Sequence, residues 1–119
     1  CTLKPGIVGV SDNIRVRSIV GRFLEHHRVW WFGNDGAPEL YCSSADWLER
    51  NLLRRVETAF PILDADCAQR VRREGLLNYL ADNQNAWELA ADGGYRKIAA
   101  AEGEAPFSAQ LSSLDGLYA

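Results

Sequence analysis

The chain has 119 residues, of which 47% are hydrophobic, and a formal net charge of -3 at pH 7. This length and apolar content suit one domain with a modest core. The negative charge argues against a general nucleic-acid binder, and no apolar run is long enough to span a bilayer. The sequence contains no methionine, so we expect it to be a domain of a longer protein.

The types of cation and the spacing of the cysteines indicate which binding sites the chain can form. In residues 1–60 most cations are arginines, which suit bidentate contact with phosphate or carboxylate, although a solvated face or a local ion pair remains the alternative for each. Cys1, Cys42 and Cys67 lie far apart and form no Cys-x-x-Cys pair. This spacing favours buried or half-buried reduced thiols in a cytosolic protein over a zinc site or a disulfide scaffold.

The first quarter of the chain predicts a loop followed by a strand. Residues 4–13 are rich in turn formers. Residues 14–17 alternate apolar and basic side chains, which predicts a half-buried strand with Arg15 and Arg17 on one face. Residues 18–25 are compatible with a short helix or with continuation of that strand.

A β-hairpin is predicted next. The β-rich run 28–32 and the strand 39–42 are joined by the turn 33–36, whose residues are Gly-Asn-Asp-Gly. If alternate residues of the first strand share one face, His26 shares the face of Arg28. The two side chains would then lie side by side at the open end of the hairpin.

A short helix and another strand are expected after the hairpin. The run Ser43-Ser44-Ala45-Asp46 has side chains that can cap a helix from Trp47 to Leu53. The free N–H groups and the positive dipole end of such a helix would favour an anion. Residues 55–61 predict a strand with Glu57 near its middle.

The second half predicts a long helix. Asp64 can cap an amphipathic helix that ends near Ala81, although Gly75 weakens it slightly. The side chains expected to face inward are Val71, Leu76, Leu77 and Leu80.

The end of the chain predicts a small hairpin and a tail. Residues 87–89 and 95–98 flank a Gly-rich turn, which is typical of a hairpin. Residues 99–107 predict a linker, and the final dozen residues predict a short helix or a frayed tail. We therefore expect a domain over residues 1–98 and a linker with a C-terminal tail over residues 99–119.

One group of side chains has the chemistry of an anion site. His26 can take or give a proton or a phosphoryl group near neutral pH, and Arg28 and backbone donors can hold phosphate oxygens. A catalytic histidine needs its second ring nitrogen held, usually by a carboxylate. Two explanations of Glu57 remain open at this point: a surface salt bridge to Arg54 or Arg55, or orientation of His26.

Three blocks of sequence closely resemble the C-terminal domain of bacterial polyphosphate kinase of the long-chain type. The blocks are Ser11–Val16, Arg22–Val29, and Ser43–Trp47 with Arg50-Asn51. The resemblance runs in register over residues 3–98. That family is similar in fold to the phospholipase D superfamily, whose site is assembled from two homologous halves. The resemblance implies an α/β fold, namely a phospholipase D-like half with a mixed β-sheet flanked by helices, and it identifies this chain as the second half.

The resemblance also implies roles for single residues. His26 stands at the motif histidine, Arg28 at the motif lysine, residues 43–46 at the Gly-Ser-x-Asn turn, and Glu57 at the acid that holds the histidine. This chain departs from the superfamily pattern: arginine replaces lysine, the turn has Ser for Gly and Asp for Asn, and Gly33 falls where an aspartate is expected. These departures fit the kinase branch and disfavour phosphodiesterase chemistry.

The activity implied by the resemblance is reversible transfer of the terminal phosphate of ATP to polyphosphate. The phosphohistidine would lie in the preceding half of the same polypeptide, with His26 and Glu57 as catalytic residues of this half. ATP or phosphate would be bound by His26, Arg28, Ser44 and Arg15. The family implies a Mg²⁺ requirement, and we assign no metal ligand in this chain. The isolated chain lacks the nucleophile and is expected to be inactive.

Two other functions remain open from the sequence. In a non-catalytic structural or oligomerisation domain, His26 and Glu57 would form a satisfied polar contact, and the tryptophans would belong to a core or subunit interface. The second alternative is that the chain is one half of a phospholipase D-type phosphodiesterase. The family implies a homo-oligomer. We expect a cytoplasmic location, with peripheral attachment to the inner membrane as the alternative, and no nucleic-acid partner.

Overall fold

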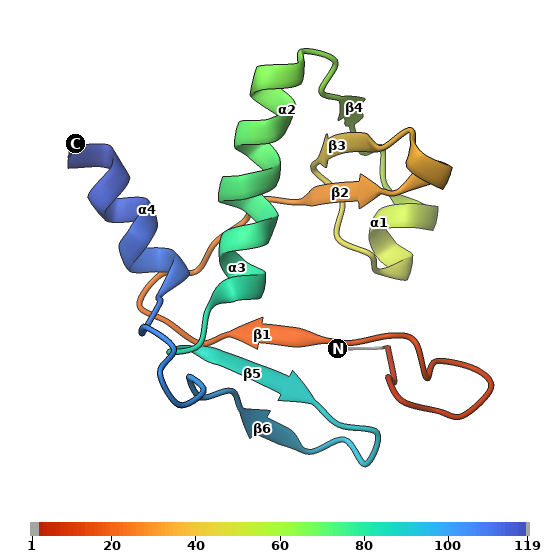
Figure 1. Cartoon of the computed structure of the whole chain (residues 1–119). Coiled ribbons are helices and arrows are strands. Elements are labelled where there is room, and N and C mark those ends of the chain that lie inside the picture. Colours follow the sequence, from red (N-terminus) through yellow and green to blue (C-terminus); the bar gives the residue numbers. More distant parts are fainter. Residues whose placement is uncertain (1–2, 119) are drawn as a thin grey trace. The chain divides into compact units, whose positions relative to one another are not determined.

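Two compact units make up the chain in a computed structural model that describes residues 3–118. The first unit combines residues before 24 with residues from 79 onward, and the second is Leu24–Asn78. Each unit contains one three-stranded sheet, labelled in Figure 1. The predicted α/β class is confirmed. The expected single mixed sheet is instead two sheets, and every strand pair in the described part of the chain is antiparallel.

The sheet of the first unit has the order β1-β5-β6. Its strands are β1 (Arg17–Ile19), β5 (Ala86–Leu89) and β6 (Tyr95–Lys97). The β5–β6 pair confirms the hairpin predicted near the end of the chain. The first strand begins at Arg17, so the strand predicted over residues 14–17 is wrong in position. The amide of Ile14 donates to the carbonyl of Ser11 at 3.1 Å, so Ile14 belongs to a turn. The pairing of β1 with β5 begins only at Arg17.

A buried carboxylate organises the other end of the first unit. Asp82 is 1% exposed. Its Oδ1 accepts from the amides of Gln84 and Asn85 at 2.9 and 2.6 Å, and its Oδ2 accepts from the amide of Ala109 at 2.9 Å. Ala109 is the first residue of helix α4 (Ala109–Tyr118). The same carboxylate therefore shapes the turn before β5 and caps the positive end of α4.

Helix α4 is also tied to the segment that follows β1. The buried Gln110 side chain donates to the carbonyl of Phe23 at 2.8 Å and accepts from its amide at 3.2 Å. A Cβ at Gly21 would clash with Gln110 Oε1, so only glycine fits there without moving the glutamine. Residues 109–118 thus form a helix, which has buried contacts at Ala109 and Gln110. The domain boundary expected at residue 98 stays a prediction.

The sheet of the second unit has the order β2-β3-β4, with helix α1 between its last two strands in sequence. Its elements are β2 (Val29–Phe32), β3 (Glu39–Ser43), α1 (Glu49–Arg54) and β4 (Ala59–Pro61). The predicted hairpin is confirmed, because β2 pairs with β3 across the short 3₁₀ turn Asn34–Gly36. Because β4 starts at Ala59, Glu57 precedes the strand, and its predicted place within the strand is wrong.

One continuous helical stretch follows β4 and consists of α2 (Ala65–Arg72), a π-helical segment (Arg73–Leu77) and α3 (Asn78–Ala81). Asp64 caps its start as predicted, accepting from the amide of Cys67 at 2.8 Å. Within the π segment, a Cβ at Gly75 would lie 2.9 Å from Val29 Cγ2, so this glycine permits close approach to β2.

The π segment explains one error in the predicted apolar face of this helix. Val71 and Leu76 are half-buried, whereas Leu77 and Leu80 are 39% and 50% exposed. A π turn inserts one extra residue and rotates the following side chains about the axis, so the 3.6-residue period no longer predicts their direction. Within residues 3–118, no helix has the length and apolar character needed to cross a membrane.

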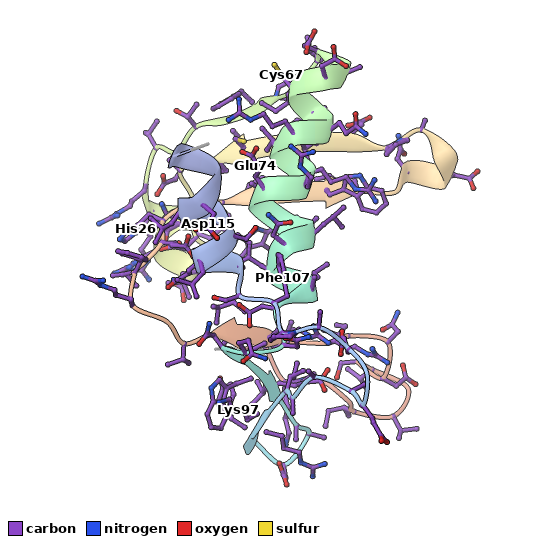
Figure 2. The ribbon with its side chains drawn as sticks, turned by 60° about the vertical axis from the view of Figure 1, so that its left-hand side comes forward. His26, Cys67, Glu74, Lys97, Phe107 and Asp115 are labelled. Atoms are coloured by element: carbon purple, nitrogen blue, oxygen red, sulfur yellow. The ribbon has the colours of Figure 1, made fainter. Side chains whose placement is uncertain are left out.

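The cysteines described by the structure, Cys42 and Cys67, carry free thiols, and the burial expected for them is found at Cys42 but is wrong for Cys67. Cys42 is half-buried on β3, and Cys67 is exposed near the start of α2 (Figure 2). Cys1 lies outside the described residues.

Candidate functional site

Arg28 stands immediately before β2 and is held by two bonds in the second unit. Its Nε donates to Asp46 Oδ1 at 2.9 Å, and its Nη1 donates to the backbone carbonyl of His26 at 2.9 Å. The Arg28 and Asp46 side chains are 28% and 38% exposed, so the pair is half-buried. Within residues 3–118 the Nη2 group has no hydrogen-bond partner. An oriented guanidinium with free N–H groups suits phosphate oxygens.

His26 precedes β2, and its side chain is exposed, as can be followed in Figure 2. Its contact with Arg28 runs through its backbone carbonyl, which keeps the imidazole accessible to a ligand. The hydrogen bond from Arg28 is the largest cause of a lowered pKa of Asp46, and the charges of Arg50 and His26 lower that pKa further. Arg28 therefore bonds the Asp46 carboxylate directly, while Arg50 and His26 act on it through their charges.

The Ser-rich turn does not cap α1, and the predicted cap is wrong. Helix α1 has Leu48 at its N-cap position and no side-chain cap. The side chains that could cap it are engaged elsewhere: Asp46 binds Arg28, and the hydroxyl of Ser43 donates to the carbonyl of Thr58 at 3.1 Å. The side chains of Asp46 and Ser43, which the local pattern predicted to cap the helix, thus bind partners far away in sequence. The anion site expected at the N-terminus of this helix stays a prediction, and the observed α1 has six residues.

Glu57 is held at both carboxylate oxygens. Its Oε2 accepts from Ser44 Oγ at 2.6 Å, and its Oε1 accepts from Asn51 Nδ2 at 2.8 Å. These two bonds lower the pKa of Glu57, with that from Ser44 the larger cause, and the charges of Arg55 and Arg28 add to the effect. The carboxylate is therefore fixed in orientation and favoured in its ionised form.

Within the described residues, Glu57 makes no hydrogen bond to any of the three partners considered from the sequence. It does not bond His26, and Arg54 pairs instead with Glu49 at 3.0 Å. The third candidate, Arg55, contributes only a nearby positive charge. The structure thus brings Glu57 to the Ser-rich turn, and its catalytic role stays a prediction.

The two remaining predicted ligands lie in different surroundings. Ser44 has both of its donors engaged, because its hydroxyl bonds Glu57 and its amide donates to the carbonyl of Thr58 at 2.9 Å. Binding of phosphate by Ser44 would therefore require one of these bonds to break. Arg15 belongs to the first unit and is exposed. Its phosphate-binding role stays a prediction.

Asn51 also belongs to the group of side chains around Glu57, and the sequence analysis did not predict its contact there. It is 4% exposed, and its carbonyl oxygen is buried without a hydrogen-bond partner within the described residues. One signal was present in the sequence, because asparagine is a poor helix former and stands here within an otherwise helix-favouring run. Burial could be known only from the fold.

A metal site needs several ligating side chains grouped at one place. Within residues 3–118, no three His, Cys, Asp or Glu side chains are grouped to hold a metal ion. The carboxylates of the cluster instead have protein donors as partners. This part of the chain therefore does not fit a Mg²⁺ site of its own, and the Mg²⁺ requirement stays a prediction.

Lowering the pH is expected to destabilise the chain through Glu57 and Asp46. Their ordinary pKa values are 4.5 and 3.8, and folding lowers both, so the folded state binds fewer protons. The stabilisation is fully present above about pH 4.5 and is lost as the pH falls through the lowered values. We expect a smaller decrease of the thermal midpoint on acidification in a Glu57→Gln, Asp46→Asn double variant, followed by circular dichroism. Equal decreases in both proteins would contradict this.

An α/β domain with an accessible histidine, an oriented arginine and a fixed carboxylate has side chains whose chemistry suits phosphate groups. The family model described as polyphosphate kinase C-terminal domain 2 matches residues 1–110. The chain belongs to the family of polyphosphate kinase C-terminal domains.

Individual relatives agree with this assignment. The chain is 63% identical over 117 residues to a polyphosphate kinase of Xylella fastidiosa, covering 98% of this chain and 17% of that protein. It is 56% identical over 114 residues to a polyphosphate kinase of Burkholderia multivorans, covering 96% of this chain and 16% of that protein. The crystal structure of the Porphyromonas gingivalis polyphosphate kinase aligns with a TM-score of 0.82 and 37% identity, over 91% of this chain and 16% of that one. The chain therefore spans only a small part of its relatives.

Proposed function

We propose that this chain is part of a polyphosphate kinase that reversibly transfers the terminal phosphate of ATP to polyphosphate. The observation that carries the proposal is the family match over residues 1–110. In this proposal the phosphohistidine lies upstream of the chain, in the preceding half of the same polypeptide. The domain described here contributes the second half of the site.

The geometry supports particular roles in that site. Arg28 would bind phosphate oxygens through its free Nη2 group, while its other bonds keep the guanidinium in place. The exposed His26 would contact the nucleotide phosphates and act as acid, base or electrostatic stabiliser. Glu57 would supply a fixed negative charge that favours the protonated form of a neighbouring histidine in the assembled site.

Apolar surface of the second unit supports contact with the rest of the polypeptide. Leu53, Val56 and Leu63 are 77%, 102% and 89% exposed. Exposed apolar side chains in such number are typical of surfaces that another protein segment covers. In this proposal, the preceding half of the polypeptide covers part of this surface.

The remaining parts of the proposal come from the resemblance. Mg²⁺ would be held by phosphate oxygens and residues outside this chain, and when bound it would neutralise charge on the transferred phosphate. The full-length protein would form a homo-oligomer. It would be cytoplasmic, with peripheral attachment to the inner membrane as the alternative.

Incubation of the full-length protein with ATP and Mg²⁺ tests the proposed activity directly. Acid-insoluble polyphosphate should accumulate together with ADP. Supplying polyphosphate and ADP should return ATP, because the transfer is reversible. Absence of both polymer and ATP formation from a folded protein would refute the proposal.

The isolated chain is expected to show no turnover with ATP, because half of the site, including the nucleophile, is outside it. ADP release should not exceed that of a His26→Ala version of the same chain. A coupled assay for ADP provides the measurement. Release clearly above that control would contradict the assignment of the nucleophile to the preceding half.

A further inference from the structure

We propose that Asn51 is a positioning residue that fixes the carboxylate of Glu57 for phosphoryl transfer at this site. The inference deepens the proposed function and rests on it. It is carried by contacts within the second unit.

The first observation is the geometry of the Glu57 carboxylate. Asn51 Nδ2 donates to Oε1 at 2.8 Å, and Ser44 Oγ donates to Oε2 at 2.6 Å. Ser44 Oγ in turn accepts from the amide of Thr58 at 3.0 Å, which fixes the hydroxyl. Each carboxylate oxygen thus has one donor from α1 or from the Ser-rich turn. Since an ionised carboxylate can accept about four hydrogen bonds, Glu57 keeps capacity for a further donor in the assembled site.

The second observation is that asparagine at position 51 lowers the stability of the folded state. The side chain is 4% exposed, and its Oδ1 is buried with no partner within the part of the chain that the structure describes. An unpartnered buried carbonyl opposes folding, and asparagine also has a low helix propensity. An apolar side chain such as leucine would avoid both penalties. The benefit of asparagine here is therefore the bond that its Nδ2 makes to Glu57.

The bond has a specific electrostatic consequence. Nδ2 can only donate, so it favours the ionised form of the oxygen that it contacts. The charged groups acting on Glu57 are Arg55, which follows α1, and Arg28, which precedes β2, and both also favour ionisation. Asn51 adds a directional bond to this background charge, which determines where the carboxylate points.

The test replaces Asn51 with aspartate in the full-length protein. Asn51→Asp keeps the size of the side chain but places a second carboxylate against Glu57. Like charges at this distance raise the pKa of one member of the pair. We expect the acidic limb of the pH profile of kcat/KM for ATP in polyphosphate synthesis to move upward by about one pH unit. Activity should recover in part at higher pH.

A matched control is available at the turn between β2 and β3. Asn34 also donates through Nδ2 to a glutamate, at 3.3 Å from Glu39 Oε1, but this pair is exposed. Asn34→Asp therefore introduces the same change of charge in the same unit. Its pH profile should coincide with that of the wild-type protein.

The outcomes separate this inference from the proposed function. If the wild-type protein makes polymer and a folded Asn51→Asp protein keeps the wild-type pH profile, the inference about Asn51 is wrong. If the wild-type protein makes no polymer, the proposed function itself fails. Should Asn51→Asp not fold, Asn51→Ala removes the same donor without adding charge. A smaller upward movement of the acidic limb is then expected, and an unchanged profile overturns the inference.

Discussion

Replacing His26 with alanine in the full-length protein is expected to reduce polyphosphate synthesis from ATP by about 100-fold or more. The side chain is exposed, and the His26 backbone is bonded to the oriented Arg28, so removing the imidazole takes away the acid, base or electrostatic group proposed to act at the phosphates. The fold should be preserved, because the bond from Arg28 goes to the backbone carbonyl of His26 and survives the substitution. Acid-insoluble polyphosphate and ADP, measured together, give the readout.

The adjacent His27 provides a matched control. It is also an exposed histidine, and no role at the phosphates is assigned to it. His27→Ala should retain activity within a few-fold of the wild-type protein. Polymer synthesis near the wild-type rate in a folded His26→Ala protein would assign this domain a scaffolding role and remove His26 from the site.

Replacing Asp82 with alanine is expected to lower the free energy of unfolding by about 3 kcal/mol. Its carboxylate is buried and accepts hydrogen bonds from the amides of Gln84, Asn85 and Ala109. Without it, these donors lose their partner, which for the buried amide of Ala109 happens away from water, and the start of α4 loses its cap. Urea unfolding of the wild-type and variant chains, followed by circular dichroism, measures the difference.

Asp92 offers a control of the same residue type in the same unit. Its Oδ1 accepts from the amide of Gly94 at 2.9 Å, but this turn is exposed. Asp92→Ala should cost less than about 1 kcal/mol, because water can replace the lost partner. An Asp82→Ala cost as small as that of Asp92→Ala would show that the buried network does not hold the first unit together.

The elements predicted correctly are those built from contacts close in sequence. The hairpin of β2 and β3 follows from two β-rich runs around a turn in which Asn34, Asp35 and Gly36 adopt positive φ. The start of α2 follows from Asp64, which caps the amide three residues later. Such features depend on neighbours a few residues away, so the sequence pattern suffices to place them.

The errors occur where a distant partner competes for a local group. Asp46 has the side chain of a helix cap, but Arg28 binds it across 18 residues. Glu57 was placed within a strand by its β-favouring neighbours, whereas bonds from Ser44 and Asn51 hold it before β4. Because the charged or short bonds to these partners are stronger than the local alternatives, the pattern around each residue mispredicted its role.

For the candidate site, the order of residues along the chain was enough to select His26, Arg28 and Glu57, since the motif spacing and the family resemblance need no coordinates. How these side chains meet depended on folding. The tertiary structure joins Arg28 to the backbone of His26 and joins Glu57 to Asn51 on α1. The physical reason is that residue type and spacing specify which groups are able to bond. Which of several partners far apart in sequence actually bond depends on the path of the folded chain and on burial.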